Sequence, residues 1–106
     1  MSLAKLFICD LKELRNVESL VKFSETLRDE VIVFSISGGE ILCFSSVCPH
    51  MAGEIFFNRA NNALHCKWHG LEFSEAGAST NCKGTLQLRK YKTEISEEKV
   101  FLFYEP

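Results

Sequence analysis

Hydrophobic residues occur along the chain in short runs rich in Val, Ile, Leu and Phe, separated by turn-forming residues. The clearest run precedes Gly38-Gly39, a pair that tolerates the positive φ of a tight hairpin turn. Many short strands at regular spacing are typical of an all-β sandwich or barrel. The pattern predicts strands at residues 6–9, 30–37, 40–45, 54–57, 63–66, 71–73, 86–95 and 99–104.

Residues 10–28 fit two interpretations. Apolar residues recur there at the spacing of one helix face: Leu11, Leu14, Val17, Leu20, Val21 and Leu27. Ser19, Val21 and Phe23 also alternate with their neighbours, as they would in a strand. Periodicity alone favours a helix over this segment.

Composition places the chain among ordinary globular domains. Its 106 residues fit one domain, 1–106, with 46% apolar and 25% charged residues. The net charge of −2 provides no basic field for nucleic acid or an anionic membrane. No apolar run approaches the roughly 20 residues of a membrane span, and no secretory signal is visible at the N-terminus. We therefore expect neither nucleic acid nor membrane as a partner.

The cysteines indicate a reducing compartment. The chain has five of them, and Cys9, Cys43 and Cys82 are scattered without the spacing of a disulfide framework. Such usage is typical of the cytoplasm, where thiols stay reduced. We expect Cys9 and Cys43 to be small buried hydrophobic residues on strands.

The remaining two cysteines belong to a repeated pairing of Cys with His. Cys48-Pro49-His50 is followed, after fifteen residues, by Cys66-Lys67-Trp68-His69. Two thiolates and two imidazoles suit either tetrahedral zinc or a [2Fe–2S] cluster with both Cys on one iron. Structural zinc sites mostly pair Cys with Cys and His with His. The mixed spacing instead lets each loop supply a Cys to one iron and a His to the other.

At these residues the chain resembles the Rieske family. Cys48-Pro49-His50 is similar to the family's first cluster loop, and Cys66-Lys67-Trp68-His69-Gly70 to the second. The resemblance implies a Rieske-type [2Fe–2S] cluster as cofactor. It implies four ligands that bind both metal and cofactor: Cys48, His50, Cys66 and His69.

The resemblance also implies the fold. It is an all-β, Rieske-like antiparallel β-sandwich with a small cluster-binding subdomain of two ligand loops, at about residues 45–75. For the ambiguous segment, the family implies a short turn at 11–15 and a strand around 18–24. We adopt that interpretation in preference to the helix.

Three departures from the family pattern bear on the branch. Rieske proteins of cytochrome bc complexes add a Cys to each ligand loop, where this chain has Gly53 and Trp68. They also place a Ser after the second His-Gly, where this chain has Leu71. The chain therefore looks like the ferredoxin and ring-hydroxylating oxygenase branch. The family's third loop usually contains Gly-Pro, whereas the segment around Cys82 lacks Pro.

The favoured function is electron transfer without catalysis. The resemblance implies a Rieske-type ferredoxin that takes one electron from a reductase and passes it to a terminal oxygenase. An oxygenase would also need a mononuclear iron held by two His and a carboxylate, and only His65 remains for it. A Rieske domain of a larger oxygenase and a structural zinc module are the alternatives.

Overall fold

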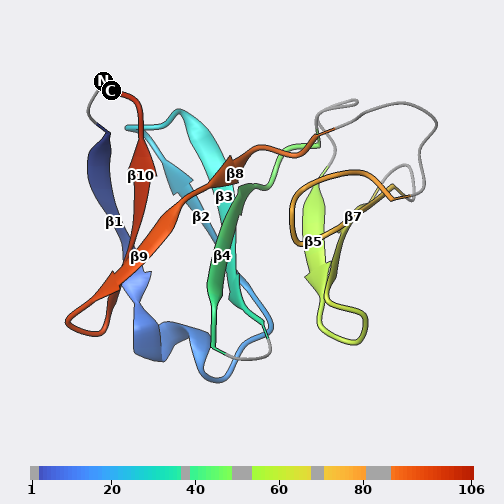
Figure 1. Cartoon of the computed structure of the whole chain (residues 1–106), viewed down its shortest axis with the longest axis horizontal. Helices are drawn as coiled ribbons and strands as arrows, with labels where there is room; N and C mark the ends of the chain where they lie inside the picture. The colour runs from blue at the N-terminus through green and yellow to red at the C-terminus, as the bar shows by residue number, and fades with distance from the viewer. Residues whose placement is uncertain (1–2, 37–38, 49–53, 68–70, 81–86) are drawn as a thin grey trace.

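The structure is a computed structural model that describes residues 3–36, 39–48, 54–67, 71–80 and 87–106. The strands of these described residues form three antiparallel sheets, which lie next to one another as layers in Figure 1. The first sheet has the order β1-β10-β9, with β1 at Ala4–Asp10, β9 at Thr93–Ser96 and β10 at Lys99–Tyr104. The second has the order β2-β3-β4-β8, with bounds Leu20–Ser24, Asp29–Ser35, Ile41–Ser45 and Lys90–Tyr91. The third has the order β5-β6-β7, with bounds Ile55–Asn58, Ala63–Cys66 and Glu72–Phe73.

The sheet β2-β3-β4-β8 lies between the other two, and its strand β3 is buried on both faces. Val31 and Val33 join an apolar cluster shared with β1 and β10, while Ile32 and Phe34 join a second cluster shared with the sheet β5-β6-β7. Successive strand residues point to opposite faces, so one strand serves two cores. Burying each such side chain contributes about 1.5–3 kcal/mol.

An aromatic contact joins the second sheet to the third. The rings of Phe34 on β3 and Phe57 on β5 stack with centroids 3.9 Å apart and planes inclined by 14°. Both side chains are buried in the same apolar cluster. Stacked aromatic pairs contribute about 0.5–1.5 kcal/mol beyond their area. The small third sheet is therefore packed against the larger body.

The all-β, antiparallel fold class is confirmed, and the helix that periodicity favours over 10–28 is wrong. The segment forms a short 3₁₀ helix, η1, at Leu11–Leu14 and then strand β2 at Leu20–Ser24, as the family resemblance implies. Leu14 and Leu20 reach the same core from these two separate elements. Pairing of β2 with β3 overrides the local periodicity: Leu20 packs inward, whereas Val21 and Phe23 of β2 are exposed.

The expected single strand at residues 86–95 is also corrected. Within its described part, Lys90–Tyr91 pairs with β4, whereas Thr93–Ser96 pairs with β10. The change of sheet occurs at Lys92, whose carbonyl accepts a hydrogen bond from the Phe103 amide at 2.9 Å. The remaining strands appear within one or two residues of their expected bounds, where these are described.

Two turns join consecutive strands in the described residues, one in the gap between the expected strands 86–95 and 99–104 and one at the predicted Gly38-Gly39 turn. Glu97 and Glu98 form the two-residue loop between β9 and β10, with φ of 51° and 62°. Gly39 has φ of 86°, and its amide donates to the Ile36 carbonyl at 3.1 Å. Gly38 lies outside the described residues. Within the described part of the chain, no helix is long and apolar enough to cross a membrane.

Gly77 provides a test of how tightly the turn after β7 packs. Its φ is 86°, and an added Cβ would lie 2.7 Å from the Leu88 carbonyl and 2.6 Å from Gln87 Nε2. We expect Gly77→Ala to lower the free energy of unfolding by about 1–2 kcal/mol through the backbone conformation. Overpacking should remove a further ~1–3 kcal/mol. Denaturant titration of the purified protein measures the sum.

Gly39→Ala is the matched control. Gly39 has the same φ of 86°, but an added Cβ there meets nothing within 4 Å. Only the conformational cost of about 1–2 kcal/mol is then expected. Equal losses in the two variants would show that contacts with the Gln87-Leu88 segment do not constrain this turn.

Candidate metal centre

Cys48 follows an extended segment that continues from β4 toward β5. The Ile55 amide donates to the Ser46 carbonyl at 2.9 Å, and Val47 forms an isolated bridge with Glu54. These main-chain contacts hold the residues before Cys48 against the start of β5. The side chain of Cys48 is 1% exposed and belongs to the apolar cluster between the second and third sheets.

Cys66 is the last residue of β6 and lies opposite Ile55 in the register of β5 and β6. Its amide donates to the Leu71 carbonyl at 2.8 Å, so the end of β6 pairs with the residue that precedes β7. The cysteine is 2% exposed and belongs to the same apolar cluster as Cys48. Each cysteine therefore stands at the point where a strand enters a predicted ligand loop.

Glu54 connects the two cysteine segments. It is the bridge partner of Val47 on one side, while its carbonyl accepts from the Lys67 amide at 2.9 Å on the other. Residues next to Cys48 and next to Cys66 thus pair with the same residue. Main-chain pairing of this kind brings together two cysteines that are eighteen positions apart in the sequence.

The environment of the two thiols suits a soft metal centre. They are nearly inaccessible to solvent and packed among apolar side chains such as Ile55, Phe73 and the partly buried Leu71. Thiolate is a ligand for zinc and for iron–sulfur clusters, and a dry surrounding limits solvent access to the metal. Two thiols in one apolar cluster fit one iron of a [2Fe–2S] cluster, and by themselves they also fit zinc.

Both predicted imidazole ligands, His50 and His69, lie outside the described residues, as do Trp68 and Cys82. The four-ligand set therefore stays a prediction, of which the structure brings together the two cysteines. Gly53, which replaces a cysteine of the bc-complex proteins, is likewise outside the described part.

His65 points away from the cysteine beside it, as strand alternation predicts. Its ring stacks on Phe56, with centroids 5.4 Å apart, on the face of the third sheet opposite the apolar cluster. Its Nε2 atom lies 3.9 Å from Glu72 Oε2 and 3.5 Å from the side-chain nitrogen of Asn61. These contacts occupy the imidazole within a surface network.

Cys9 and Cys43 are buried in the other apolar cluster, as expected. Burial, together with the nearby Glu13 carboxylate, raises the pKa of Cys9 to about 11. Burial also raises the pKa of Cys43, and the neighbouring Cys9 adds to this increase. A thiol with such a pKa stays protonated near neutral pH and is a poor nucleophile or metal ligand. These two residues act as small hydrophobic side chains.

Lys67 brings a positive charge to the second ligand loop, where the family usually has Pro. Its ammonium lies 3.7 Å from a carboxylate oxygen of Glu54, and both side chains are largely exposed. An exposed pair of this kind contributes about 0–1 kcal/mol. The Glu54 carboxylate partly offsets the positive charge that Lys67 brings to the loop.

Sequence reasoning missed the polar contacts of the segment before Cys48. Ser45 and Ser46 are both buried, and their hydroxyls donate to the carboxylates of Asp29 and Glu30. A pair of serines at the end of an apolar strand, two residues before a ligand loop, was the available signal. Their partners lie sixteen residues earlier and could not be identified without the pairing of β3 and β4.

Comparison with known proteins identifies the family. Residues 4–92 match the Rieske [2Fe-2S] domain, so the chain belongs to that family. Its members bind a [2Fe–2S] cluster through two cysteines and two histidines, and the expected cofactor of this chain is thereby confirmed.

The chain is also similar to individual proteins. It is 28% identical, over 72 residues, to the cytochrome b6-f complex iron-sulfur subunit of Chlorobaculum tepidum; the match covers 68% of this chain and 39% of that protein. Its fold is similar to a ferredoxin of Sphingomonas yanoikuyae, with a TM-score of 0.79, 18% identity, and 96% and 100% of the two chains covered. A chain from the complex of a reduced oxygenase and an oxidised ferredoxin in carbazole 1,9a-dioxygenase has a TM-score of 0.76 and 16% identity, with 92% and 91% covered.

Separate substitutions of the two site cysteines test their assignment. We expect Cys48→Ser and Cys66→Ser each to lose the visible absorbance and the bound iron, because each removes one of two thiolates. Absorbance spectra combined with iron and sulfide analysis measure this loss.

The control variants are Cys9→Ala and Cys43→Ala, which remove thiols of equal burial from the other core. Both should keep the full spectrum. A complete spectrum in Cys48→Ser would contradict the assignment of that residue.

Proposed function

We propose that this chain carries one electron on a Rieske-type [2Fe–2S] cluster held by Cys48, His50, Cys66 and His69. Replacing two thiolates by neutral imidazoles raises the potential of such a cluster above that of all-cysteine clusters. The observation that carries the proposal is the meeting of two buried cysteines at the entrances of two loops, each of which contains a histidine. Membership of the Rieske family supports the same assignment.

The chain's own residues position the two cysteine ligands and keep water away from them. Pairing of the Cys48 and Cys66 segments with Glu54 and Ile55 sets the separation of the two thiols. The apolar cluster around them excludes water, and the cysteines themselves are almost unexposed.

We propose a reductase as electron donor and a terminal oxygenase as acceptor. Three features of the sequence support this branch: Gly53 and Trp68 replace the extra cysteines, and Leu71 replaces the serine of the bc-complex proteins. The similar fold of a chain in a complex of oxygenase and ferredoxin also supports it. In this role the chain is a carrier component and catalyses no reaction itself.

A second candidate is an electron carrier of a quinol-oxidising complex. The observation that favours it is the 28% identity to a cytochrome b6-f iron-sulfur subunit. The match spans 39% of that protein's length, so the chain could serve as one domain of a larger protein. A domain of a larger oxygenase is a further form of the same alternative. Rates of reoxidation by an oxygenase and by a c-type cytochrome would separate the two candidates.

We further propose that residues 1–106 fold as a single domain and function in the cytoplasm. The two apolar clusters share strand β3, which supports a single domain. Cys9, Cys43 and Cys82 are scattered without the spacing of a disulfide framework, which supports a reducing compartment.

Spectroscopy of the purified protein tests the proposed function directly. The oxidised protein should be coloured, should contain two irons and two sulfides per chain, and should take up one electron on titration with dithionite. A colourless protein containing zinc would overturn the electron-carrier proposal in favour of a structural zinc module.

The reduction potential is expected toward the low end of the roughly −150 to +300 mV Rieske range. The physical reason is that Leu71, which packs against the apolar cluster, has no hydroxyl to donate to the reduced, more negative cluster. Leu71→Ser should raise the potential. Protein-film voltammetry of both proteins measures this difference, and a wild-type value near the top of the range would contradict the expectation.

A further inference from the structure

Two consecutive acidic residues face two consecutive serines across the pairing of β3 and β4. Asp29 and Glu30 begin β3, while Ser45 ends β4 and Ser46 continues it. The hydroxyl of Ser45 donates to Asp29 Oδ1 at 3.0 Å, and that of Ser46 donates to Glu30 Oε1 at 2.7 Å. Because neighbouring strand residues alternate, the two acid–serine pairs lie on opposite faces of the sheet.

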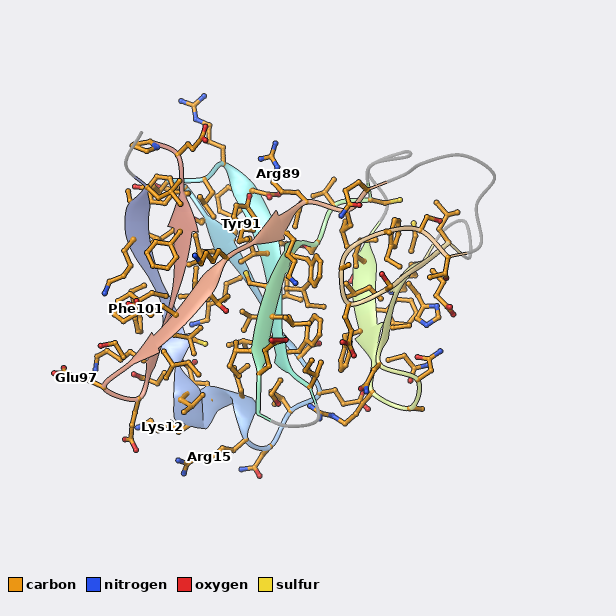
Figure 2. All side chains as sticks on the ribbon, viewed as in Figure 1. Lys12, Arg15, Arg89, Tyr91, Glu97 and Phe101 are labelled. Carbon is orange, nitrogen blue, oxygen red and sulfur yellow. The ribbon has the colours of Figure 1, made fainter. Side chains whose placement is uncertain are left out.

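The Asp29 pair reaches the main chain next to Cys48. Ser45 Oγ also accepts a hydrogen bond from the Val47 amide at 3.3 Å, and Val47 precedes Cys48. The second oxygen of Asp29 accepts from the Tyr91 hydroxyl at 2.8 Å. Burial of Tyr91 and this hydrogen bond raise its pKa, so the hydroxyl stays a donor. Tyr91 and Arg89 are labelled beside β8 in Figure 2.

The Glu30 pair binds the strand end to the neighbouring strand β3 and, through Ser46, to the third sheet. The Ser46 amide donates to the Glu30 carbonyl at 2.7 Å, and its hydroxyl lies 3.1 Å from the same oxygen. Its carbonyl accepts from the Ile55 amide at 2.9 Å. Ser46 therefore joins β3 to β5, and Ile55 is the residue that pairs with Cys66.

Burial makes these contacts necessary. Ser45 and Ser46 are 7% and 2% exposed, and they are the buried polar residues of the described part of the chain. A buried hydroxyl without a partner costs about 1–3 kcal/mol. Both hydroxyls are satisfied by a carboxylate, and hydrogen bonds to charged groups are stronger than those between neutral ones.

The two carboxylates approach the Cys48 segment from opposite faces of the sheet: Glu30 shares the face of Ile32 and Phe34, whereas Asp29 shares the face of Val31 and Tyr91. Asp29 and Cys48 line the same surface hollow, whose volume is about 610 Å³. Ser46 and Cys48 are two residues apart on an extended segment, a separation of about 7 Å along the chain, and share one face. Glu30, the hydrogen-bond partner of Ser46, therefore lies on the same face of the sheet as Cys48.

We propose that the Asp29–Ser45 and Glu30–Ser46 pairs are positioning residues for the first ligand loop, and that their two carboxylates lower the reduction potential of the bound cluster. This inference rests on the proposed function. A negative charge near a cluster disfavours the additional electron of the reduced state. The two hydroxyls position the loop, because they bind Ser45 and Ser46 to the carboxylates of Asp29 and Glu30. These two serines directly precede Val47 and Cys48 in the chain.

Asp29→Asn and Glu30→Gln test the charges. Each substitution keeps the shape and one acceptor oxygen, and hydroxyl groups can turn to accept from the new amide. We expect each variant to raise the potential of the holoprotein, so that the reduced-to-oxidised ratio at fixed potential increases severalfold. A tenfold increase corresponds to ~59 mV for one electron.

Ser45→Ala and Ser46→Ala test the positioning. They keep both charges and remove the links, so we expect a changed electron paramagnetic resonance line shape and faster loss of the cluster in air. Thr93→Val is the matched control, since its hydroxyl donates to the Ile41 carbonyl at 2.8 Å, at the opposite end of β4. It should alter neither the potential nor the line shape.

The outcomes separate this inference from the proposed function. A wild-type protein without a Rieske spectrum overturns the proposed function before any variant is compared. A normal wild-type spectrum, with Asp29→Asn and Glu30→Gln at the wild-type potential, overturns the electrostatic part. Line shapes and cluster lifetimes of Ser45→Ala and Ser46→Ala equal to those of Thr93→Val overturn the positioning part.

Discussion

The main-chain pairing around Glu54 and Ile55 is the constraint on which the centre depends. Ile55 lies opposite Cys66, and its amide binds the carbonyl of Ser46, two residues before Cys48. Glu54 pairs with the residues adjacent to both cysteines. A shift of one residue in this register would turn one cysteine to the opposite face of its strand. Backbone hydrogen bonds thus set how the two cysteine segments lie relative to each other.

That pairing is supported by a second constraint, the double burial of β3. One face of the strand packs on the sheet β1-β10-β9 and the other on the sheet that carries Cys66, so both cores are attached to one backbone. The stack of Phe34 on Phe57 fixes the third sheet to this backbone. Movement of the cysteine-bearing sheet would have to open an aromatic core, which explains how a small subdomain holds its position.

Polar side chains at the same strand end complete the arrangement. Asp29 and Glu30 enter the space between sheets as partners of buried serines and of Tyr91. Charged groups are costly to bury unless such partners are present. Through Ser45 and Ser46, these two acidic residues, which are distant in the sequence, thus hold the main chain that leads to Cys48.

The sequence by itself determined the fold class, most strand positions and the identity of the candidate ligands. It did so because β-branched runs, a Gly-Gly turn and mixed Cys/His spacing are local signals, and because the Rieske resemblance resolved residues 10–28. The tertiary structure alone decided that β8 and β9 belong to different sheets, that Cys9 and Cys43 fill a separate core, and that Ser45 and Ser46 bind Asp29 and Glu30. Each of these depends on which strands become neighbours, and that choice is made by burial and hydrogen bonding across the whole chain, which no local pattern records.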